Sequence, residues 1–178
     1  ERGGLRLAFL AYVNTPSDSV SGFDVSATAA TSGQPGVAWA TPEAVAADVA
    51  AATRLADVVI VSLHTGLEYQ EPPSDLQVAL AHAAIDAGAR LVLGHHPHVL
   101  QGIERYRDGL IIYSLGNFVF DFDEVDYAQP GLPSALSAVL QVQLTRDGVV
   151  GCRILPIAID AADGRPHPAA GEDAQAVL

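Results

Sequence analysis

Apolar residues in the first half of the chain fall into short runs, and segments with helix signals separate these runs. Residues 5–11, 58–63 and 91–93 are largely apolar, as is typical of strands buried in a parallel sheet. The segment 41–54 opens with Thr-Pro-Glu, and the segment 74–88 opens with a Ser-x-x-Gln capping box and closes on glycine. This alternation predicts parallel βαβ units and therefore an α/β fold.

The second half follows a different pattern, with strands that pair through tight turns. Residues 103–106 and 110–115 flank the turn sequence Arg107-Asp108-Gly109. Residues 140–144 alternate between apolar and polar positions, and the chain turns at Asp147-Gly148 into a further run over 149–159. We therefore expect antiparallel hairpins after the parallel units.

Length and composition favour one globular domain. The chain has 178 residues, of which 49% are hydrophobic and 17% charged. We expect a single domain over residues 1–160 and a flexible tail over 161–178, where Gly, Pro, Ala and Asp dominate. The segment 14–40, rich in small residues, is long for a connection and favours a lid, a binding loop or a mobile segment.

Charge and cysteine content exclude several classes of function. The net charge is −12 and every basic residue is arginine, which disfavours nucleic acid and anionic membrane surfaces as partners. The single Cys152 excludes an internal disulfide, and its place between Val150 and Ile154 predicts a packed thiol. No apolar run reaches the length of about 18 residues that a membrane span needs. The first residue is Glu1, so we expect a removed leader or a longer polypeptide.

Three histidines lie within residues 94–98, Gly-His-His-Pro-His, directly after an apolar strand. Such strand ends are where ligands bind in α/β sheets, and neutral imidazole is a common metal ligand. A βαβ unit would bring His64, at the end of the preceding strand, to the same rim. The following hairpin would return Asn117 to the same place. This convergence predicts a metal site, and the alternative is a polar scaffold of hydrogen-bonded histidines.

Carboxylates are missing from this predicted site. A two-metal hydrolytic centre normally has bridging carboxylates, whereas imidazoles and an amide carry no negative charge. Glu68 follows His64 closely and could either orient a ligand histidine or face solvent. The remaining nearby acidic residues follow Asn117, namely Asp121, Asp123, Glu124 and Asp126.

Three motifs occur in order, namely His64-x-Gly66-x-Glu68-Tyr69, Gly94-x-His96-Pro97-His98-Val99-x-Gln101 and Tyr113-Ser114-Leu115-Gly116-Asn117-Phe118. In order and spacing they resemble the CapA-type poly-γ-glutamate capsule-synthesis proteins of the calcineurin-like metallophosphoesterase superfamily. The resemblance covers residues 5 to 157 and implies part of a layered α/β sandwich with its metal site at the carboxyl rim. The first half of that domain, which carries a Gly-Asp motif and an Asn-His element, has no counterpart here, so the isolated chain is expected to bind metal weakly and to be inactive.

The resemblance also assigns roles to individual residues. It implies His64, His96 and His98 as ligands of one or two divalent metal ions, which would be Mn, Zn or Fe by ligand type. His95 is then the candidate catalytic residue that protonates a leaving group, while an ion in the site would activate water for attack on a phosphoryl or amide centre. The candidates for substrate binding or for support of the ligands are Glu68, Gln101 and Asn117.

The implied function is that of a metal-dependent, phosphoesterase-like protein of poly-γ-glutamate capsule biosynthesis. Its substrate would be an anionic polymer or a phosphoester, and cations would have to neutralise the pocket because the chain is acidic. The implied location is extracytoplasmic, at the cell surface or associated with the membrane, with a possible membrane capsule-synthesis complex as partner. One departure is His64-Thr65-Gly66, where the family commonly has His-Trp-Gly. The alternatives are a non-catalytic assembly or polymer-handling component and a generic phosphodiesterase unrelated to capsules.

Overall fold

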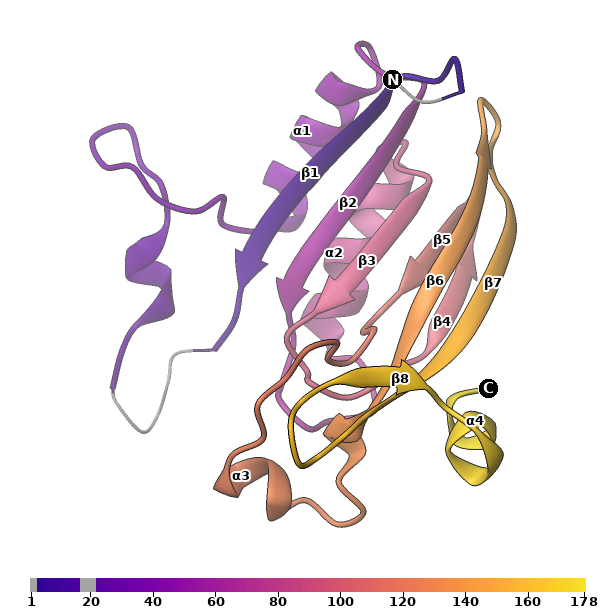
Figure 1. The fold of residues 1–178 in the computed structure, drawn as a ribbon. Helices are drawn as coiled ribbons and strands as arrows, with labels where there is room; N and C mark the ends of the chain where they lie inside the picture. The colour runs from indigo at the N-terminus through magenta and orange to yellow at the C-terminus, as the bar shows by residue number, and fades with distance from the viewer. Residues whose placement is uncertain (1–2, 17–21) are drawn as a thin grey trace.

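A five-stranded sheet forms the centre of the computed structural model, which describes residues 3–16 and 22–178 (Figure 1). The strand order is β1-β2-β3-β5-β4. The strands β1, β2, β3 and β5 run parallel, and β4 pairs with β5 in the antiparallel direction at one edge. Their bounds are β1 (Leu7–Asn14), β2 (Val58–Thr65), β3 (Leu91–His95), β4 (Ile103–Tyr106) and β5 (Gly109–Ile112). The predicted parallel βαβ units are therefore confirmed.

Two helices cover one face of this sheet, α1 (Pro42–Ala52) and α2 (Asp75–Asp86) (Figure 1). Thr41 caps α1, and the Ser74–Gln77 capping box predicted from sequence opens α2. Because apolar residues recur on one side of each helix, both helices can pack on the sheet. The core between helices and sheet is made of residues such as Val45, Val49, Leu80, Ala84, Val59, Val61 and Val92.

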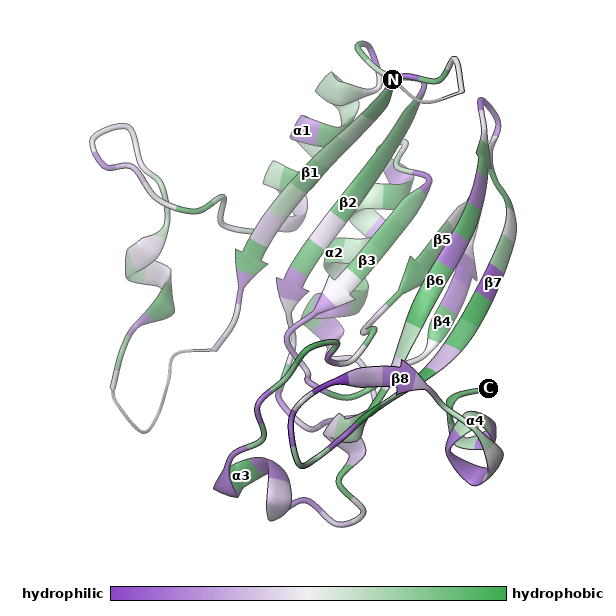
Figure 2. Cartoon of the chain, viewed as in Figure 1, coloured by the Kyte–Doolittle hydropathy of each residue, from purple (hydrophilic) through white to green (hydrophobic). Residues whose placement is uncertain are grey.

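A three-stranded antiparallel sheet in the order β6-β7-β8 packs against the other face (Figure 1). It comprises β6 (Leu136–Thr145), β7 (Gly148–Ile159) and β8 (Pro166–Pro168). Alternate residues of β6, Leu140, Val142 and Leu144, contact a second core cluster that includes Ile60 and Ile112. The result is a layered α/β sandwich, in which both faces of β2 and β3 are hydrophobic (Figure 2).

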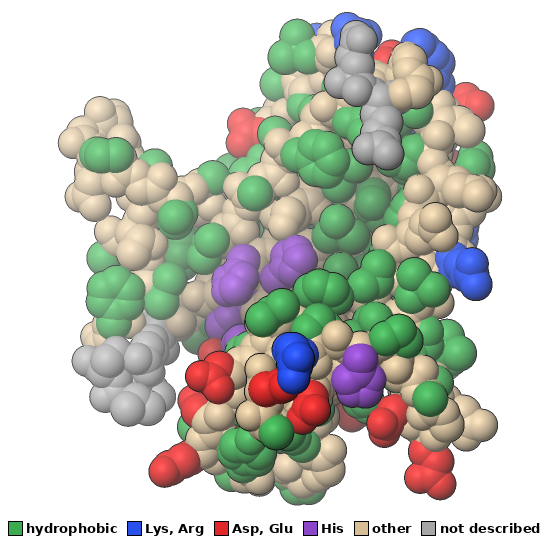
Figure 3. Space-filling view, in the orientation of Figure 1, with side chains coloured by type: hydrophobic (Ala, Val, Ile, Leu, Met, Phe, Trp, Pro, Cys, Tyr) green, Lys and Arg blue, Asp and Glu red, His purple; other side chains and the backbone are tan. Residues whose placement is uncertain are grey.

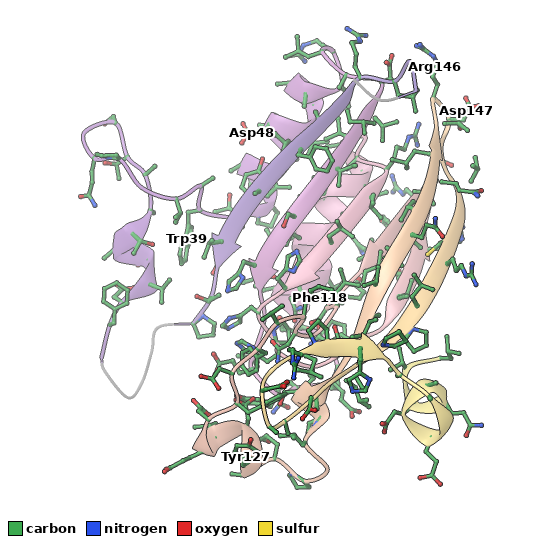
Figure 4. All side chains as sticks on the ribbon, viewed as in Figure 1. Trp39, Asp48, Phe118, Tyr127, Arg146 and Asp147 are labelled. Atoms are coloured by element: carbon green, nitrogen blue, oxygen red, sulfur yellow. The ribbon has the colours of Figure 1, made fainter. Side chains whose placement is uncertain are left out.

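The turn between β6 and β7 is tied to the first sheet at the end opposite the histidines. This turn carries Arg146 and Asp147 (Figure 4). Arg146 forms an ion pair with Asp57 at 2.9 Å and donates to the carbonyl of Gly4 at 3.2 Å. Side chains thus connect the two sheets at this end, whereas the apolar core connects them along their length.

The segment 14–40 forms an arm that projects from the body, as far as the structure describes it; residues 17–21 lie outside the described residues (Figure 1). The arm contains the short helix η1 (Val25–Thr28) and returns to the body beside β1. There Trp39 forms a parallel bridge with Val13, and the amide of Ala40 donates to the carbonyl of Val13 at 2.9 Å. Backbone hydrogen bonds therefore anchor the end of the segment near Trp39 to β1.

Residues 161–178, which we expected to form a flexible tail, instead contain regular structure. β8 pairs with the last three residues of β7, Ile157–Ile159, and α4 (Gly171–Val177) follows it and contacts β6 and β7. The reason is that β7 offers a free edge, whose backbone groups gain hydrogen bonds when a third strand is added. Composition alone did not show this, because the pairing partner lies in another segment.

The side chain of Cys152 is exposed, so the prediction of a packed thiol is wrong. The core cluster on this side of the molecule takes in Val149 of β7, whereas the neighbouring Val150 is 60% exposed. The alternation along β7 was therefore a poor guide to burial at this position. Among the described residues, no helix has the length and the apolar composition needed to cross a membrane.

Candidate metal centre

His64 and His95 lie side by side at the carboxyl rim of the sheet. β2 and β3 are parallel, and their register pairs His64 with His95. Parallel neighbours in register project to the same face, so both imidazoles leave the sheet on the side of β6. The sequence-based expectation that the strand ends bring these histidines together is met.

A tight turn directs His96 and His98 back toward His64. His96 has φ +101° and His98 has φ +62°, both in the left-handed region that non-glycine residues rarely adopt. The ring centroids of His64 and His96 are 5.0 Å apart, and those of His96 and His98 are 6.2 Å apart. Figure 3 shows histidine side chains gathered in one hollow, with acidic side chains on one side and hydrophobic ones on the other.

Asn117 fixes the protonation pattern of His98. Its Nδ2 donates to the carbonyl of His98 at 3.3 Å and to the carbonyl of Ser134 at 3.1 Å, so Oδ1 is the atom that faces the imidazole. Oδ1 lies 2.9 Å from Nδ1 of His98. An amide oxygen only accepts hydrogen bonds, so Nδ1 carries the proton and Nε2 keeps its lone pair. This is the arrangement that a metal-binding histidine requires.

The surroundings of the cluster favour neutral imidazoles. Burial lowers the pKa of His96 to about 4, and repulsion from His64 and His98 adds to the effect. Partial burial likewise lowers the pKa of His64, with repulsion from His95 and His98 as the further causes, and burial lowers the pKa of His95. At neutral pH the nitrogen lone pairs of these rings are therefore free to bind a cation.

The spacing of the rings fits a shared ion only in part. Two imidazoles bound to one tetrahedral ion, with metal–nitrogen bonds of about 2.1 Å, have ring centroids roughly 5 Å apart. His64 and His96 meet this distance, whereas His96 and His98 are farther apart at 6.2 Å. Within residues 3–16 and 22–178, no three His, Cys, Asp or Glu side chains are already placed to hold a metal. His98 would have to lie closer to His96 for all three imidazoles to bind the same ion.

Carboxylates do not complete the cluster among the residues that the structure describes. Glu68 is exposed, while Asp126 is buried and accepts a hydrogen bond from the Tyr69 hydroxyl at 3.1 Å. The acidic residues that follow Asn117 lie on or next to the short helix α3 (Glu124–Tyr127). The site is therefore a group of neutral imidazoles beside the acidic segment that follows Asn117.

Gln101, which we expected near the substrate or behind the ligands, has other partners. Its Oε1 accepts from Nε2 of Gln77 at 2.8 Å, and its own Nε2 donates to the carbonyls of Gln70 and Pro72 at 2.7 and 3.4 Å. The side chain is only 8% exposed. Gln101 thus ties α2 to the loop that follows β2, and its hydrogen-bonding groups are occupied by these contacts.

An apolar groove of about 460 Å³ opens beside the histidines. It runs between the first sheet and β6, and His95 and Asn117 line it together with hydrophobic residues such as Phe9, Leu93, Leu140 and Phe118. Phe9 is 69% exposed, and Phe118 lies where the groove meets the loop after β5 (Figure 4). His95 therefore faces an apolar surface.

Sequence reasoning gave no role to the aromatic residues around His98. The ring of Tyr69 stacks on His98 with centroids 6.1 Å apart, and Phe120 contacts the imidazole at 5.2 Å. Tyr69 stood within a motif, but its contact with His98 depends on two loops whose approach the sequence does not show. Phe120 follows Asn117 closely in sequence, and this proximity was the one signal in the sequence that could have placed it near His98.

Comparison with known proteins identifies the family. Residues 1–122 match the family model described as "Bacterial capsule synthesis protein PGA_cap". The chain belongs to the PGA_cap family. The matched residues include the histidine cluster, Gln101 and Asn117, so the site described above lies within the part that defines the family.

Several curated relatives of this PGA_cap chain carry capsule, PGA or polyglutamine-synthesis names. It is 42% identical over 138 residues to the PGA biosynthesis protein CapA of Bacillus subtilis (strain 168). This alignment covers 78% of this chain and 34% of the relative. It is 44% identical over 113 residues to the capsule biosynthesis protein CapA of Bacillus anthracis, with coverage of 64% and 25%. A probable polyglutamine synthesis accessory protein of Mycobacterium tuberculosis (strain CDC 1551 / Oshkosh) is 41% identical over 81 residues, with coverage of 46% and 21%. The chain thus spans about a third of the Bacillus subtilis relative and less of the others.

Proposed function

We propose that this chain forms the histidine-bearing part of a metal-dependent, phosphoesterase-like centre in a capsule biosynthesis protein. The observation that carries the proposal is the meeting of His64, His96 and His98 at one rim, with Asn117 holding His98 in the tautomer that leaves Nε2 free. A divalent ion of the Mn, Zn or Fe type bound there would polarise a phosphoryl or carbonyl group for hydrolysis.

The residues of the chain would divide the remaining tasks. The three imidazoles would hold the cation, and Asn117 would keep one of them oriented. His95 lines the apolar groove beside them and is the candidate for protonating a leaving group. Its lowered pKa means that it holds a proton only weakly at neutral pH, so in this role it would have to take up a proton released by the attacking water and pass it to the leaving group.

Charge limits the substrates that the site could accept. The net charge is −12, and acidic side chains lie on one side of the histidines (Figure 3). An anionic polymer such as polyglutamate, or a phosphoester, would be repelled unless bound cations neutralise the pocket. We propose an anionic substrate whose binding depends on the metal. The names of the relatives support a place in a capsule-synthesis complex, and the family resemblance is the basis for a position at the cell surface.

A non-catalytic role in polymer handling is the second candidate. It is favoured by the distance of 6.2 Å between the ring centroids of His96 and His98, which is longer than the spacing that two imidazoles on one ion require. Metal-dependent hydrolysis would require His98 to move closer to His96, whereas a polar scaffold of histidines would keep the observed distance between the two rings.

Activity with metal separates these candidates. The protein, purified at the length at which its host produces it, is assayed with Mn²⁺ on a generic phosphodiester, with His64→Ala as test variant and His167→Ala as control. His167 lies in β8, exposed and outside the cluster. We expect metal-dependent hydrolysis that His64→Ala abolishes and His167→Ala leaves unchanged. Absence of bound metal and of hydrolysis in the unaltered protein would refute the enzymatic role and leave polymer handling.

A further inference from the structure

Tyr69 contacts the turn that carries His96 and His98 through both its backbone and its ring. Its amide donates to the carbonyl of Pro97 at 2.9 Å. Its ring lies over the imidazole of His98, with centroids 6.1 Å apart and planes inclined by 25°. The residue has φ +56°, in the left-handed region, and such a conformation persists only when surrounding contacts maintain it. The loop after β2 is therefore held against the residues that follow β3.

A buried carboxylate anchors the far end of Tyr69. The hydroxyl donates to Oδ1 of Asp126 at 3.1 Å, and Asp126 is only 1% exposed. The other oxygen of Asp126 accepts from the amide of Asp123 at 3.1 Å, as part of the reciprocal cap that opens α3. Burial and the nearby carboxylates raise the pKa of Tyr69 well above its ordinary value, so the hydroxyl stays a donor at any working pH.

Phe120 and Asn117 also contact the imidazole of His98. Phe120 contacts it with centroids 5.2 Å apart, and the amide of Phe120 donates to the carbonyl of Gly164 at 3.2 Å. Asn117 fixes which nitrogen of the ring is protonated. The hydrogen bond that His98 donates to Asn117 sets the direction of Nδ1, and the flanking aromatic rings restrict the tilt of the imidazole plane.

We propose that Tyr69, anchored by Asp126, is a positioning residue that sets the ring plane of His98. The inference rests on the proposed metal-binding function, because it assigns to Tyr69 the control of a ligand that the function requires. Asp126 acts indirectly. It is a buried acid in the segment after Asn117, and it holds the hydroxyl of Tyr69 rather than binding the ion. The loops after β2 and β5 thereby cooperate in holding one histidine that follows β3.

Two substitutions of Tyr69 separate the hydroxyl from the ring. Tyr69→Phe keeps the stack on His98 and removes the bond to Asp126, whereas Tyr69→Leu removes both. Tyr127→Phe is the matched control, because Tyr127 also donates its hydroxyl, to the carbonyl of Ala161 at 2.8 Å, and it lies on α3 (Figure 4). Each variant is titrated with Mn²⁺, and the protein labelled with ¹⁵N-histidine is followed by NMR without metal.

We expect Tyr69→Phe to weaken Mn²⁺ binding about tenfold and Tyr69→Leu to weaken it further, as for other residues that support metal ligands. Tyr127→Phe should bind as the unaltered protein does. In the metal-free spectra, the ring nitrogens of His98 should shift or broaden in Tyr69→Phe. Those of His82, which lies on α2 and contacts Glu104, should stay unchanged. A purely structural role for Tyr69 would lower the urea midpoint without this selective change at His98.

The outcomes distinguish this inference from the function on which it rests. If the unaltered protein binds no Mn²⁺, the proposed function fails, and the metal-free spectra of His98 still decide whether Tyr69 positions the ring. If Tyr69→Phe binds Mn²⁺ as tightly as the unaltered protein and leaves the His98 signals in place, the inference is overturned. Should Tyr69→Leu fail to fold, the comparison of Tyr69→Phe with Tyr127→Phe remains decisive.

Discussion

Replacement of Gln101 by alanine tests whether this residue serves the fold or the histidine site. The substitution removes an acceptor for Gln77 and a donor to the carbonyls of Gln70 and Pro72. Both glutamine side chains are buried, Gln77 at 2% and Gln101 at 8% exposure, so water replaces these bonds poorly. We therefore expect a loss of stability and a secondary effect, at most, on metal binding.

The magnitude follows from the partners that are left behind. A hydrogen bond contributes a net 0.5–1.5 kcal/mol, roughly, and a buried polar group left without a partner costs about 1–3 kcal/mol. Gln77 keeps a second acceptor, the carbonyl of Tyr113 at 3.3 Å, which reduces the penalty. We expect Gln101→Ala to lower the free energy of unfolding by about 2–4 kcal/mol.

Urea denaturation followed by circular dichroism measures this change. Gln70→Ala is the matched control: the side chain is exposed and the carbonyl that accepts from Gln101 belongs to the backbone, so it survives the substitution. The control should stay within about 0.5 kcal/mol of the unaltered protein. A Gln101→Ala variant as stable as this control, but with impaired metal binding, would refute the structural assignment and restore the role expected from the motif.

Three further results are expected. Gly94→Ala places a Cβ 1.9 Å from the carbonyl oxygen of Tyr113 and should cost at least about 1–3 kcal/mol in urea unfolding, while Gly102→Ala, which has open space, should be neutral. The free energy of unfolding should decrease as pH falls from about 6.5 toward 4. The pKa of His96 is lowered to about 4 in the folded protein, so the unfolded chain binds more protons over this range. An equal urea midpoint at pH 7.5 and pH 5 would contradict this. Cys152 should react with a thiol reagent in the folded protein at a rate close to that of the unfolded chain, and slow labelling would show that it is covered.

The sequence was sufficient to predict the elements whose signals are local. The apolar runs, the Ser74–Gln77 capping box and the change to hairpins after residue 100 all correspond to observed elements. The meeting of His64 with the histidines after β3 was predictable too, because parallel strands joined by one helix end at the same rim. These inferences needed only the hand and direction of a βαβ unit.

Features that depend on contacts between distant segments were not predictable. Gln101 stands in a motif beside the candidate ligands, and only its hydrogen bonds to Gln77 and to the loop after β2 show that it supports the fold. The pairing of β8 with β7, and the reach of Tyr69 to Asp126 over 57 positions of sequence, depend on the folding of loops. Composition and periodicity report on a residue and its neighbours, and they do not show where a loop will be held.

The central claim is that His64, His96 and His98 bind one cation together. Isothermal titration of the purified protein with Zn²⁺ at pH 7.5 tests it, with alanine at each of the three positions and with His167→Ala as the control. One ion per chain, a loss of affinity of at least tenfold in each of the three variants and an unchanged control would agree with the account. Binding that survives the loss of any one of these three imidazoles, or that depends on His167, would contradict it.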